Sequence, residues 1–168
     1  MIGDITVRRH RTGDGAELAR AWIDAGGYYA ALAPDTFQVP ETEGLEEYLG
    51  REEAAGDEPD VLRLVAEVGG RVVGAATGRI EAPDEGARYQ LQRQFTETRL
   101  MIDVVIVEQA YRRHGVGQAL MDVLEDWGRE RGASVALLDT YPESAMSLPF
   151  FTERMGYIRR SVRLWRRL

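Results

Sequence analysis

The pattern of apolar and polar positions predicts a chain in which short strands alternate with amphipathic helices. Residues 61–68 and 71–80 are two largely apolar runs on either side of Gly69-Gly70, the pattern of a β-hairpin with a two-residue turn. Residues 100–107 are almost continuously apolar, which is typical of a central strand that is buried on both faces.

After residue 115 the period of the apolar positions changes from that of a strand to that of a helix. One full helical stripe is formed by Val116, Ala119, Leu120, Val123, Leu124 and Trp127. Gly132 follows as a favoured helix end.

Weaker patterns predict the remaining elements. These are a strand over 4–9, a helix after Thr12 or Asp14 that Gly26-Gly27 weakens, a helix over about 43–55, a strand over 134–140, a helix over 144–155 and a closing strand or hairpin over 157–166. Residues 82–97 form a long polar loop, and loops of that length are often functional. The order of the elements predicts a mixed sheet with helices on it, an α/β (α+β) fold.

Length and composition narrow the function classes. A chain of 168 residues with 44% apolar and 29% charged residues predicts one globular domain, residues 1–168. The absence of cysteine excludes disulfides and zinc sites built on thiolates, and His10 and His114 are too far apart to suggest a metal centre, so we expect no metal. All 21 basic residues are arginine, which excludes a phosphate-binding loop of the type that needs lysine.

The charge is unevenly distributed along the chain. Residues 14–60 carry 13 acidic residues against Arg20 and Arg51, a balance of −11, while residues 154–168 carry six arginines and no acid. The acidic run is either a solvated face or a rim that attracts a cationic substrate. With a net charge of −7, no apolar leader and no apolar run of about 20 residues, we expect a cytoplasmic protein with neither nucleic acid nor membrane as partner.

The segment after residue 104 carries the clearest chemical signal. A buried strand runs into the short loop Arg112–Gly117, which opens the strongly amphipathic helix. Free N–H groups at a helix start, two glycines and two arginines suit a phosphate group. The residues alone leave three interpretations open: a plain turn, a dinucleotide fingerprint, or a site for the pyrophosphate of coenzyme A. Leu120 stands where the dinucleotide fingerprint needs its third glycine.

This segment closely resembles the acyl-CoA motif of the GCN5-related N-acetyltransferases (GNAT superfamily), Arg/Gln-x-x-Gly-x-Gly/Ala. Arg112, Gly115 and Gly117 occupy its three defining positions. Residues 64–74 look like the second and third strands of that family. Residues 149–157 look like its late signature, Phe-Tyr-x-x-x-Gly-Phe. The resemblance is good over 61–168 and weaker but compatible over 1–60.

The resemblance implies a sheet that splays open between the strands at 101–107 and 134–140. The pantetheine arm of acetyl-CoA is then expected in the splay, paired with backbone groups of Val105 and Val107, and the pyrophosphate at the loop Arg113–Gly117 with Gln118. The full set of cofactor-binding residues that the resemblance implies is Val105, Ile106, Val107, Arg112, Arg113, His114, Gly115, Val116, Gly117, Gln118, Ser144 and Phe151. Ser144 stands where relatives often carry an asparagine.

The resemblance also implies direct attack of an acceptor amine on the thioester, which requires a group that removes a proton from the amine. Asp103 is the candidate base because it interrupts an apolar strand; the alternative is that it pairs with Arg79 or Arg99, with Glu108 as a second candidate base. Relatives often place a tyrosine in the late signature, and we assign that position to Phe151, which cannot act as an acid. Tyr141 is the substitute acid, although a tyrosine in a pocket wall would look the same.

The acceptor site is expected from segments 28–40 and 82–97, whose aromatic residues include Tyr28, Tyr29, Phe37 and Tyr89. Their aromatic and acidic character suits a cationic, partly apolar amine, either a small molecule or a peptide. We therefore expect an N-acetyltransferase. The alternative is a catalytically silent GNAT domain that senses acyl-CoA or mediates interactions. The oligomeric state stays open, with a homodimer among the options.

Overall fold

A five-stranded sheet organises the fold of this protein, which we describe from a computed structural model of residues 2–54 and 58–168. The strands lie in the order β1-β2-β3-β4-β5. The first three neighbouring pairs are antiparallel and β4 pairs with β5 in parallel. Their bounds are Ile5–Arg9 (β1), Val61–Val68 (β2), Arg71–Glu81 (β3), Arg99–Val107 (β4) and Val135–Leu138 (β5). The mixed α/β fold predicted from the sequence is confirmed.

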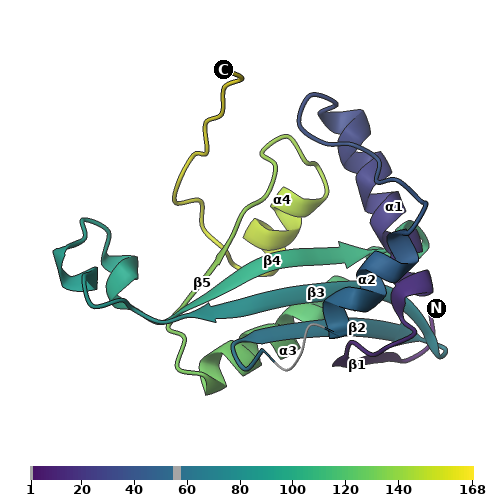
Figure 1. The fold of residues 1–168 in the computed structure, drawn as a ribbon, viewed down its shortest axis with the longest axis horizontal. Coiled ribbons are helices and arrows are strands. Elements are labelled where there is room, and N and C mark those ends of the chain that lie inside the picture. The colour runs from purple at the N-terminus through teal and green to yellow at the C-terminus, as the bar shows by residue number, and fades with distance from the viewer. Residues whose placement is uncertain (1, 55–57) are drawn as a thin grey trace.

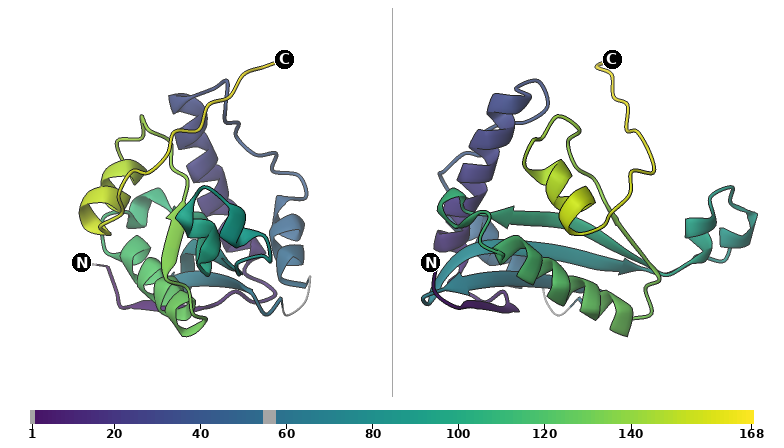
Figure 2. Two further views of the ribbon diagram at one scale, coloured as in Figure 1. Left: turned by 90° about the vertical axis from the view of Figure 1, so that its left-hand side faces the viewer. Right: turned by 180° about the vertical axis from the view of Figure 1, so that it is seen from behind.

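Helices cover both faces of the sheet (Figures 1 and 2). Helices α1 (Gly15–Leu32) and α2 (Leu45–Ala54) lie on one face, and α3 (Val116–Glu130) lies on the other. Each face has its own apolar cluster. The larger one packs the sheet against α3 around Leu120, Met121 and Leu124, and the smaller one packs it against α1 and α2 around Leu18 and Leu49.

The sheet opens between β4 and β5. Pairing of the two strands ends at Ile102 and Leu138, whereas β4 continues to Val107. The register of β4 against β3 shifts at the same point, because Ile102 pairs with Gly78 and Val104 with Thr77, which leaves Asp103 as the extra residue of a bulge. Figure 1 shows the segment after β5 moving away from β4. The splay expected from the resemblance is present.

Helix α1 is longer than its two glycines suggested, because it continues through Gly26-Gly27 to Leu32. The segment before α2 crosses α1 at this point. A Cβ on Gly26 would lie 2.5 Å from Pro40 Cδ, so the glycine allows the close crossing. Residue 55, the last of the predicted second helix, lies outside the described residues.

The helix predicted over 144–155 is shorter and less regular. It consists of α4 (Ser147–Pro149), which continues as a π-helical segment over Phe150–Arg154. The wide turn is visible in the bond from Met155 N to Phe150 O, at 3.1 Å. Segments of this kind are often found at functional sites.

The closing strand or hairpin predicted over 157–166 is wrong. The described residues after Gly156 form no strand, and Figure 1 shows this segment leaving the body of the molecule. Its apolar side chains, such as Val162 and Leu164, are exposed. Strand β5 offers an edge of only four residues for such a strand to pair with. Arg163 contacts Asp139 of the segment after β5.

Residues 82–97 are an excursion from the sheet and carry two short 3₁₀ turns, Ala87–Tyr89 and Arg93–Thr96. Figures 1 and 2 show this excursion at the end of the molecule opposite α1. Within the described residues, no helix combines the length and the apolar character that crossing a membrane would require.

Candidate functional site

The part of β4 that has lost β5 as its partner presents free backbone groups to the splay. Glu108 N donates to Val73 O at 2.8 Å. In an antiparallel pair this bond makes Ile106 and Ala75 the hydrogen-bonded pair, so the backbone groups of Ile106 face β3. The backbone groups of Val105 and Val107 therefore face the splay. Of Val105, Ile106 and Val107, which were predicted to bind the cofactor, only Ile106 turns its backbone groups away from the splay. Its side chain packs against the apolar cluster under α1.

The loop after β4 begins α3 with an unusual backbone. Arg113 has a φ of 65° and Gly115 a φ of 91°, both in the left-handed region. Gly115 at the N-cap has no side chain to cap the helix, and among the described residues none is seen to accept from the first N–H groups, which leaves them available to a ligand. Gly117 lies close to the π-helical segment, where a Cβ would come within 3.3 Å of the Phe150 ring. This backbone cradle suits an anion.

The loop residues that were predicted to bind the cofactor differ in how exposed their side chains are. Arg113 and His114 are exposed and can turn toward an anion, whereas the side chain of Val116 is buried in the core and only its backbone is available. The Gln118 side chain is half-buried, and its Oε1 accepts a hydrogen bond from Arg154 Nε at 2.9 Å.

Arg112 has a structural task that the motif did not reveal. Its Nε donates to Val107 O at 2.8 Å, and its Nη2 lies 2.8 Å from Asp24 Oδ2 on α1. Asp24 Oδ2 also accepts the backbone N–H of Gln109. The Arg112 side chain thus ties the end of β4 to α1 and is already paired. We therefore withdraw the expectation that its guanidinium holds the pyrophosphate.

Four aromatic rings that were predicted as site residues gather beside the open end of the splay. The ring centroids lie 5.0 Å apart for Tyr28 and Tyr29, 4.9 Å for Tyr29 and Phe37, and 5.4 Å for Phe37 and Tyr141. They come from α1, the following loop and the segment after β5. We call them the aromatic cluster.

Hydrogen bonds fasten the aromatic cluster to the start of α4. Tyr28 Oη lies 3.1 Å from Ser144 Oγ, and Tyr29 Oη donates to Ser147 Oγ at 3.0 Å. Ser144 is only 2% exposed, and its Oγ also accepts the backbone N–H of Ser147. Ser144 thus joins Tyr28 to α4, which is not the direct contact with a cofactor arm that we expected.

Tyr89 is not part of this group. It lies on the excursion over 82–97, is 76% exposed, and has Arg88 over its ring. The structure therefore separates the two segments from which we predicted the acceptor site, and only Tyr28, Tyr29 and Phe37 remain near the splay.

Phe151 also has a different place from the one predicted. It is 7% exposed and belongs to the core cluster on the α3 side of the sheet. Counted back from Gly156, the late signature puts its tyrosine at Thr152, so our assignment of that position to Phe151 is one residue out. Thr152 Oγ1 donates to Leu148 O at 2.9 Å. Burial and the hydrogen bond that Tyr157 donates to Glu125 raise the pKa of Tyr157, so its phenol stays protonated and is a weaker acid than an exposed tyrosine.

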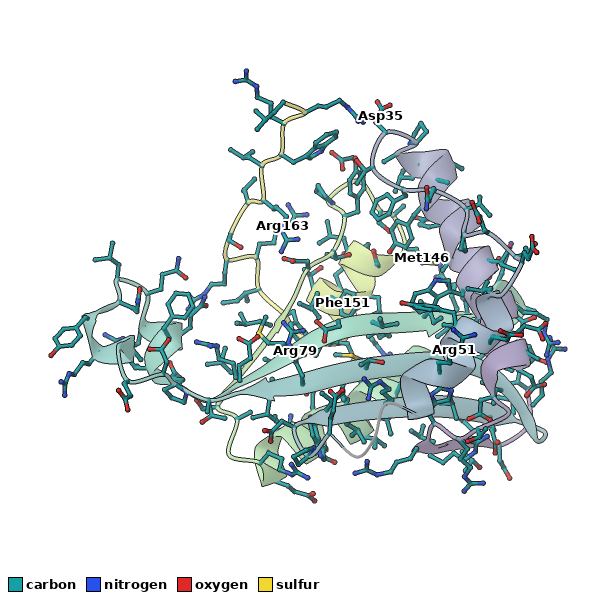
Figure 3. The ribbon with its side chains drawn as sticks, viewed as in Figure 1. Asp35, Arg51, Arg79, Met146, Phe151 and Arg163 are labelled. Carbon is teal, nitrogen blue, oxygen red and sulfur yellow. The ribbon has the colours of Figure 1, made fainter. Side chains whose placement is uncertain are left out.

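Asp103 is paired, as one of the two alternatives foresaw. Its Oδ1 contacts Arg79, whose other nitrogen lies 3.1 Å from Glu81 Oε1. The hydrogen bond that Arg79 donates to Asp103 is the main cause that raises the pKa of Arg79, so this guanidinium stays charged. Figure 3 shows Arg79 on the sheet, where the last residues of β3 lie beside the first residues of β4. Asp103 nevertheless remains 40% exposed at its side chain, and no described residue donates to its Oδ2.

The alternative partner of Asp103, Arg99, and the second candidate base, Glu108, are engaged elsewhere. Arg99 binds Glu81 Oε2 at 3.1 Å and Gln94 O at 3.2 Å. Glu108, the second candidate base, accepts a bond of 2.8 Å from Arg71 at the end of β4. Glu108 is therefore already paired, and its side chain is half-buried.

The sequence analysis missed a pocket of ≈ 220 Å³ that lies against Asp103, between the sheet and helices α1 and α2. Its polar lining includes His10, Arg63 and Thr77. Arg63 and Thr77 interrupt apolar strands just as Asp103 does, so the signal that identified Asp103 was also present at both of them.

A second pocket of ≈ 310 Å³ lies farther along α1 and is lined by Trp22, Tyr29, Gln38, Pro40 and Ile106, among others. Trp22 lines both pockets. Among the described residues, no cluster of three or more His, Asp or Glu side chains is arranged to hold a metal ion.

Comparison with known proteins places these features in context. The chain matches the Acetyltransferase (GNAT) family over residues 27–157. It is 32% identical over 104 residues to the acetyl transferase GW6a of Oryza sativa subsp. japonica, a match that covers 59% of this chain and 24% of that protein. The chain thus spans about a quarter of the length of this curated relative.

Solved structures share the whole fold at low sequence identity. The tetramutant of the BH1408 protein from Bacillus halodurans has a TM-score of 0.79 at 16% identity, with 97% of this chain and 99% of that chain covered. The aminoglycoside N-acetyltransferase AAC(6')-Iy in complex with CoA has a TM-score of 0.65 at 16% identity, with 98% and 95% covered.

Proposed function

The chain belongs to the Acetyltransferase (GNAT) family, and from that premise we propose that it is an acetyl-CoA-dependent N-acetyltransferase that acts on a primary amine. The observation that carries the proposal is the unpartnered end of β4, which leads directly into the glycine loop before α3. One segment of the chain therefore offers both a free strand edge and a site for an anion.

The residues present fit acetyl-CoA. Both backbone groups of Val105 and the N–H of Val107 would pair with the amide-bearing arm of the cofactor, as in strand addition, while the Val107 carbonyl already accepts from Arg112. The N–H groups of Gly115, Val116 and Gly117 would hold the pyrophosphate at the positive end of the α3 dipole, with Arg113 and His114 as exposed neighbours.

When bound, acetyl-CoA would supply an activated acyl carbon, which the amine nitrogen attacks as the carbon–sulfur bond breaks and the thiolate leaves. The residues of the chain orient the two reactants and move one proton. The N–H of Val107, which faces the splay, is placed to donate to a carbonyl oxygen on which negative charge develops. The Ile106 carbonyl, which shares a peptide plane with this N–H, faces β3, so pairing with β3 fixes the direction of the Val107 N–H.

Asp103 is the group we propose to accept the proton of the amine. It stands on the bulge where β4 and β5 part, and its Oδ2 is free of donors among the described residues. Arg79 holds Oδ1 and thereby fixes the direction of the carboxylate. Tyr141 remains the candidate acid for the thiolate, since its ring lies in the aromatic cluster beside the splay. A thiolate leaves readily near neutral pH even without such an acid.

The glycine loop can be tested with a single substitution. Gly117→Asp would place a carboxylate where the pyrophosphate is expected, next to the Phe150 ring. We expect calorimetric titration with acetyl-CoA to show a loss of affinity of at least tenfold. Gly27→Asp is the matched control, because it adds the same charge to a helical glycine with no atom near its Cβ position. Equal affinities for wild type and Gly117→Asp would contradict the proposal.

A second candidate function is supported by a specific observation. The tyrosine position of the late signature is Thr152, whose hydroxyl is bound to a backbone carbonyl, and Asp103 is paired with Arg79. A domain of this kind can bind acyl-CoA without transferring the acyl group. A thiol-release assay with a pool of amines separates the two functions, and the absence of cysteine removes any background from protein thiols.

A further inference from the structure

One row of polar residues crosses the sheet face that lies under α1 and α2. Arg63 of β2 is opposite Thr77 of β3, and Thr77 is opposite Val104 of β4, next to the bulged Asp103. At the other end, His10 follows β1, and its backbone N–H donates to Arg63 O at 3.0 Å. We call His10, Arg63, Thr77 and Asp103 the transverse row. The neighbouring positions on this face, Val65 and Ala75, are apolar and buried.

The transverse row lines the pocket of ≈ 220 Å³. The opposite wall is apolar and comes from the two helices, with Leu18 and Trp22 on α1 and Leu49 on α2. The pocket therefore has one apolar side and one polar side. Its Asp103 end lies at the splay, where the proposed acyl group would be, and its His10 end lies near the far edge of the sheet.

The two ends of the row differ in charge. Asp103 supplies a carboxylate with a free Oδ2, while Arg63 supplies a guanidinium about two strand spacings away, roughly 10 Å between the backbones. Arg63 is only loosely paired, because its closest approach to Glu58 is 3.8 Å, beyond hydrogen-bond distance. His10 Nε2 is buried and has no partner among the described residues.

Unused hydrogen-bonding groups in a pocket indicate a ligand with matching groups. A buried polar atom without a partner is unfavourable unless a ligand or water completes it. Here a carboxylate at one end matches an ammonium group, and a guanidinium with an imidazole at the other end matches a carboxylate. The apolar wall matches a hydrocarbon side chain.

We propose that this pocket binds the acceptor, and that the acceptor is a free amino acid or a similar small zwitterion with an apolar side chain. The amino group lies toward Asp103, the carboxylate toward Arg63 and His10, and the side chain against Trp22 and Leu49. The inference rests on the proposed acetyl transfer and replaces the expected cationic amine with a zwitterion, in which only the amino group is cationic. The volume of ≈ 220 Å³ is below the roughly 300–1,000 Å³ of pockets for drug-sized ligands, which favours one amino acid over an oligosaccharide.

Matched acceptors test the carboxylate directly. L-leucine, L-methionine and L-phenylalanine are each compared with the corresponding amide, which keeps the amine and the side chain but lacks the negative charge. Thiol release from acetyl-CoA measures turnover. We expect kcat/KM for at least one amino acid to exceed that of its amide at least tenfold.

A substitution at Arg63 tests whether this residue binds the carboxylate of the acceptor. Arg63→Gln should bring the ratio of kcat/KM for the amino acid and its amide close to one, through a higher KM for the amino acid, while the Kd for acetyl-CoA stays within twofold. Arg51→Gln is the matched control, because Arg51 lies on the exposed side of α2 and does not line the pocket (Figure 3). It should keep the wild-type ratio.

The outcomes distinguish this inference from the proposed function. If amides and amino acids are used equally, or if Arg63→Gln lowers both equally, the inference is overturned and acetyl transfer stands. The inference also fails if acetyl-CoA binds but no amino acid is turned over or raises the Tm of the CoA-bound protein. If acetyl-CoA itself does not bind, the proposed function fails, and the inference fails with it.

Discussion

Asp103 is the residue on which the proposed chemistry depends most. As the extra residue of the β4 bulge it points to the pocket side of the sheet together with Val104, at the place where β5 leaves β4. Its contact with Arg79 allows two roles, a structural ion pair and a proton acceptor with one free oxygen. The two roles differ in what a substitution should change.

We expect Asp103→Asn to lower kcat by about 10²-fold or more, the range for loss of a general base, while the Kd for acetyl-CoA changes less than about threefold. Steady-state kinetics and calorimetry measure the two quantities. Glu81→Gln is the control, because it removes the other carboxylate that Arg79 contacts. A loss of kcat, affinity and Tm in equal measure would assign Asp103 to structure alone.

Asp14 shows how a charged residue supports the fold near the transverse row. It is buried at the start of α1, where Arg8 binds it with two nitrogens at 2.8 Å and Arg11 donates its backbone N–H. Burial alone would raise the pKa of Asp14, but the hydrogen bonds from Arg8 and Arg11 outweigh burial and lower it. The folded protein therefore holds the Asp14 carboxylate more strongly than the unfolded chain does.

This linkage predicts a pH dependence of stability. The contribution of Asp14 is complete above its unfolded pKa of about 3.9 and is lost as the pH falls through the lower folded value. Asp14→Asn should lower the free energy of unfolding at pH 7 by roughly 1–3 kcal/mol. Urea denaturation should show a smaller gap between variant and wild type at pH 2.5 than at pH 7. The same gap at both pH values would contradict the linkage.

At the scale of elements, α1 connects both halves of the site. It forms the wall of the two pockets through Trp22, holds Arg112 through Asp24, and joins the aromatic cluster at its end through Tyr28 and Tyr29. Its path depends on Gly26, because Pro40 crosses the helix there. A change at this crossing should act on the whole helix.

Two neighbouring glycines of α1 give a matched test of that crossing. Alanine favours a helix over glycine by about 1 kcal/mol, so Gly27→Ala, with open space around its Cβ position, should stabilise the protein by about 0.5–1 kcal/mol. Gly26→Ala should instead destabilise it by about 1–3 kcal/mol, because the new Cβ overlaps Pro40. Thermal denaturation compares the two, and equal shifts would contradict the close crossing.

The elements also show where sequence reasoning succeeds and where it ends. The hairpin at Gly69-Gly70, the apolar run of β4 and the helical stripe of α3 are local patterns, and all three appear as predicted. The tail after Gly156 has strand-like composition, but a strand also needs a partner edge, and β5 supplies only four residues. Pairing of that kind is not encoded locally.

For the whole molecule, the sequence allowed us to locate the segments of the site, but it did not predict which residues their side chains contact. The resemblance located the splay and the glycine loop, yet Arg112 is turned to Asp24, Ser144 to Tyr28, and Phe151 into the core. Each of these contacts joins residues far apart in the chain. The transverse row also depends on residues that are far apart in the chain. The pairing of four strands brings its members together, although His10 and Asp103 lie 93 positions apart.

The central claim is that the free edge of β4 in the splay binds the cofactor arm. Residue-resolved amide hydrogen exchange by NMR, with and without acetyl-CoA, tests it most directly. We predict slower exchange at one or both of Val105 and Val107, whose N–H groups face the splay, and no change at Ile106, which already pairs with β3. Unchanged exchange at both valines under saturating acetyl-CoA, or protection confined to another part of the protein, would contradict the account.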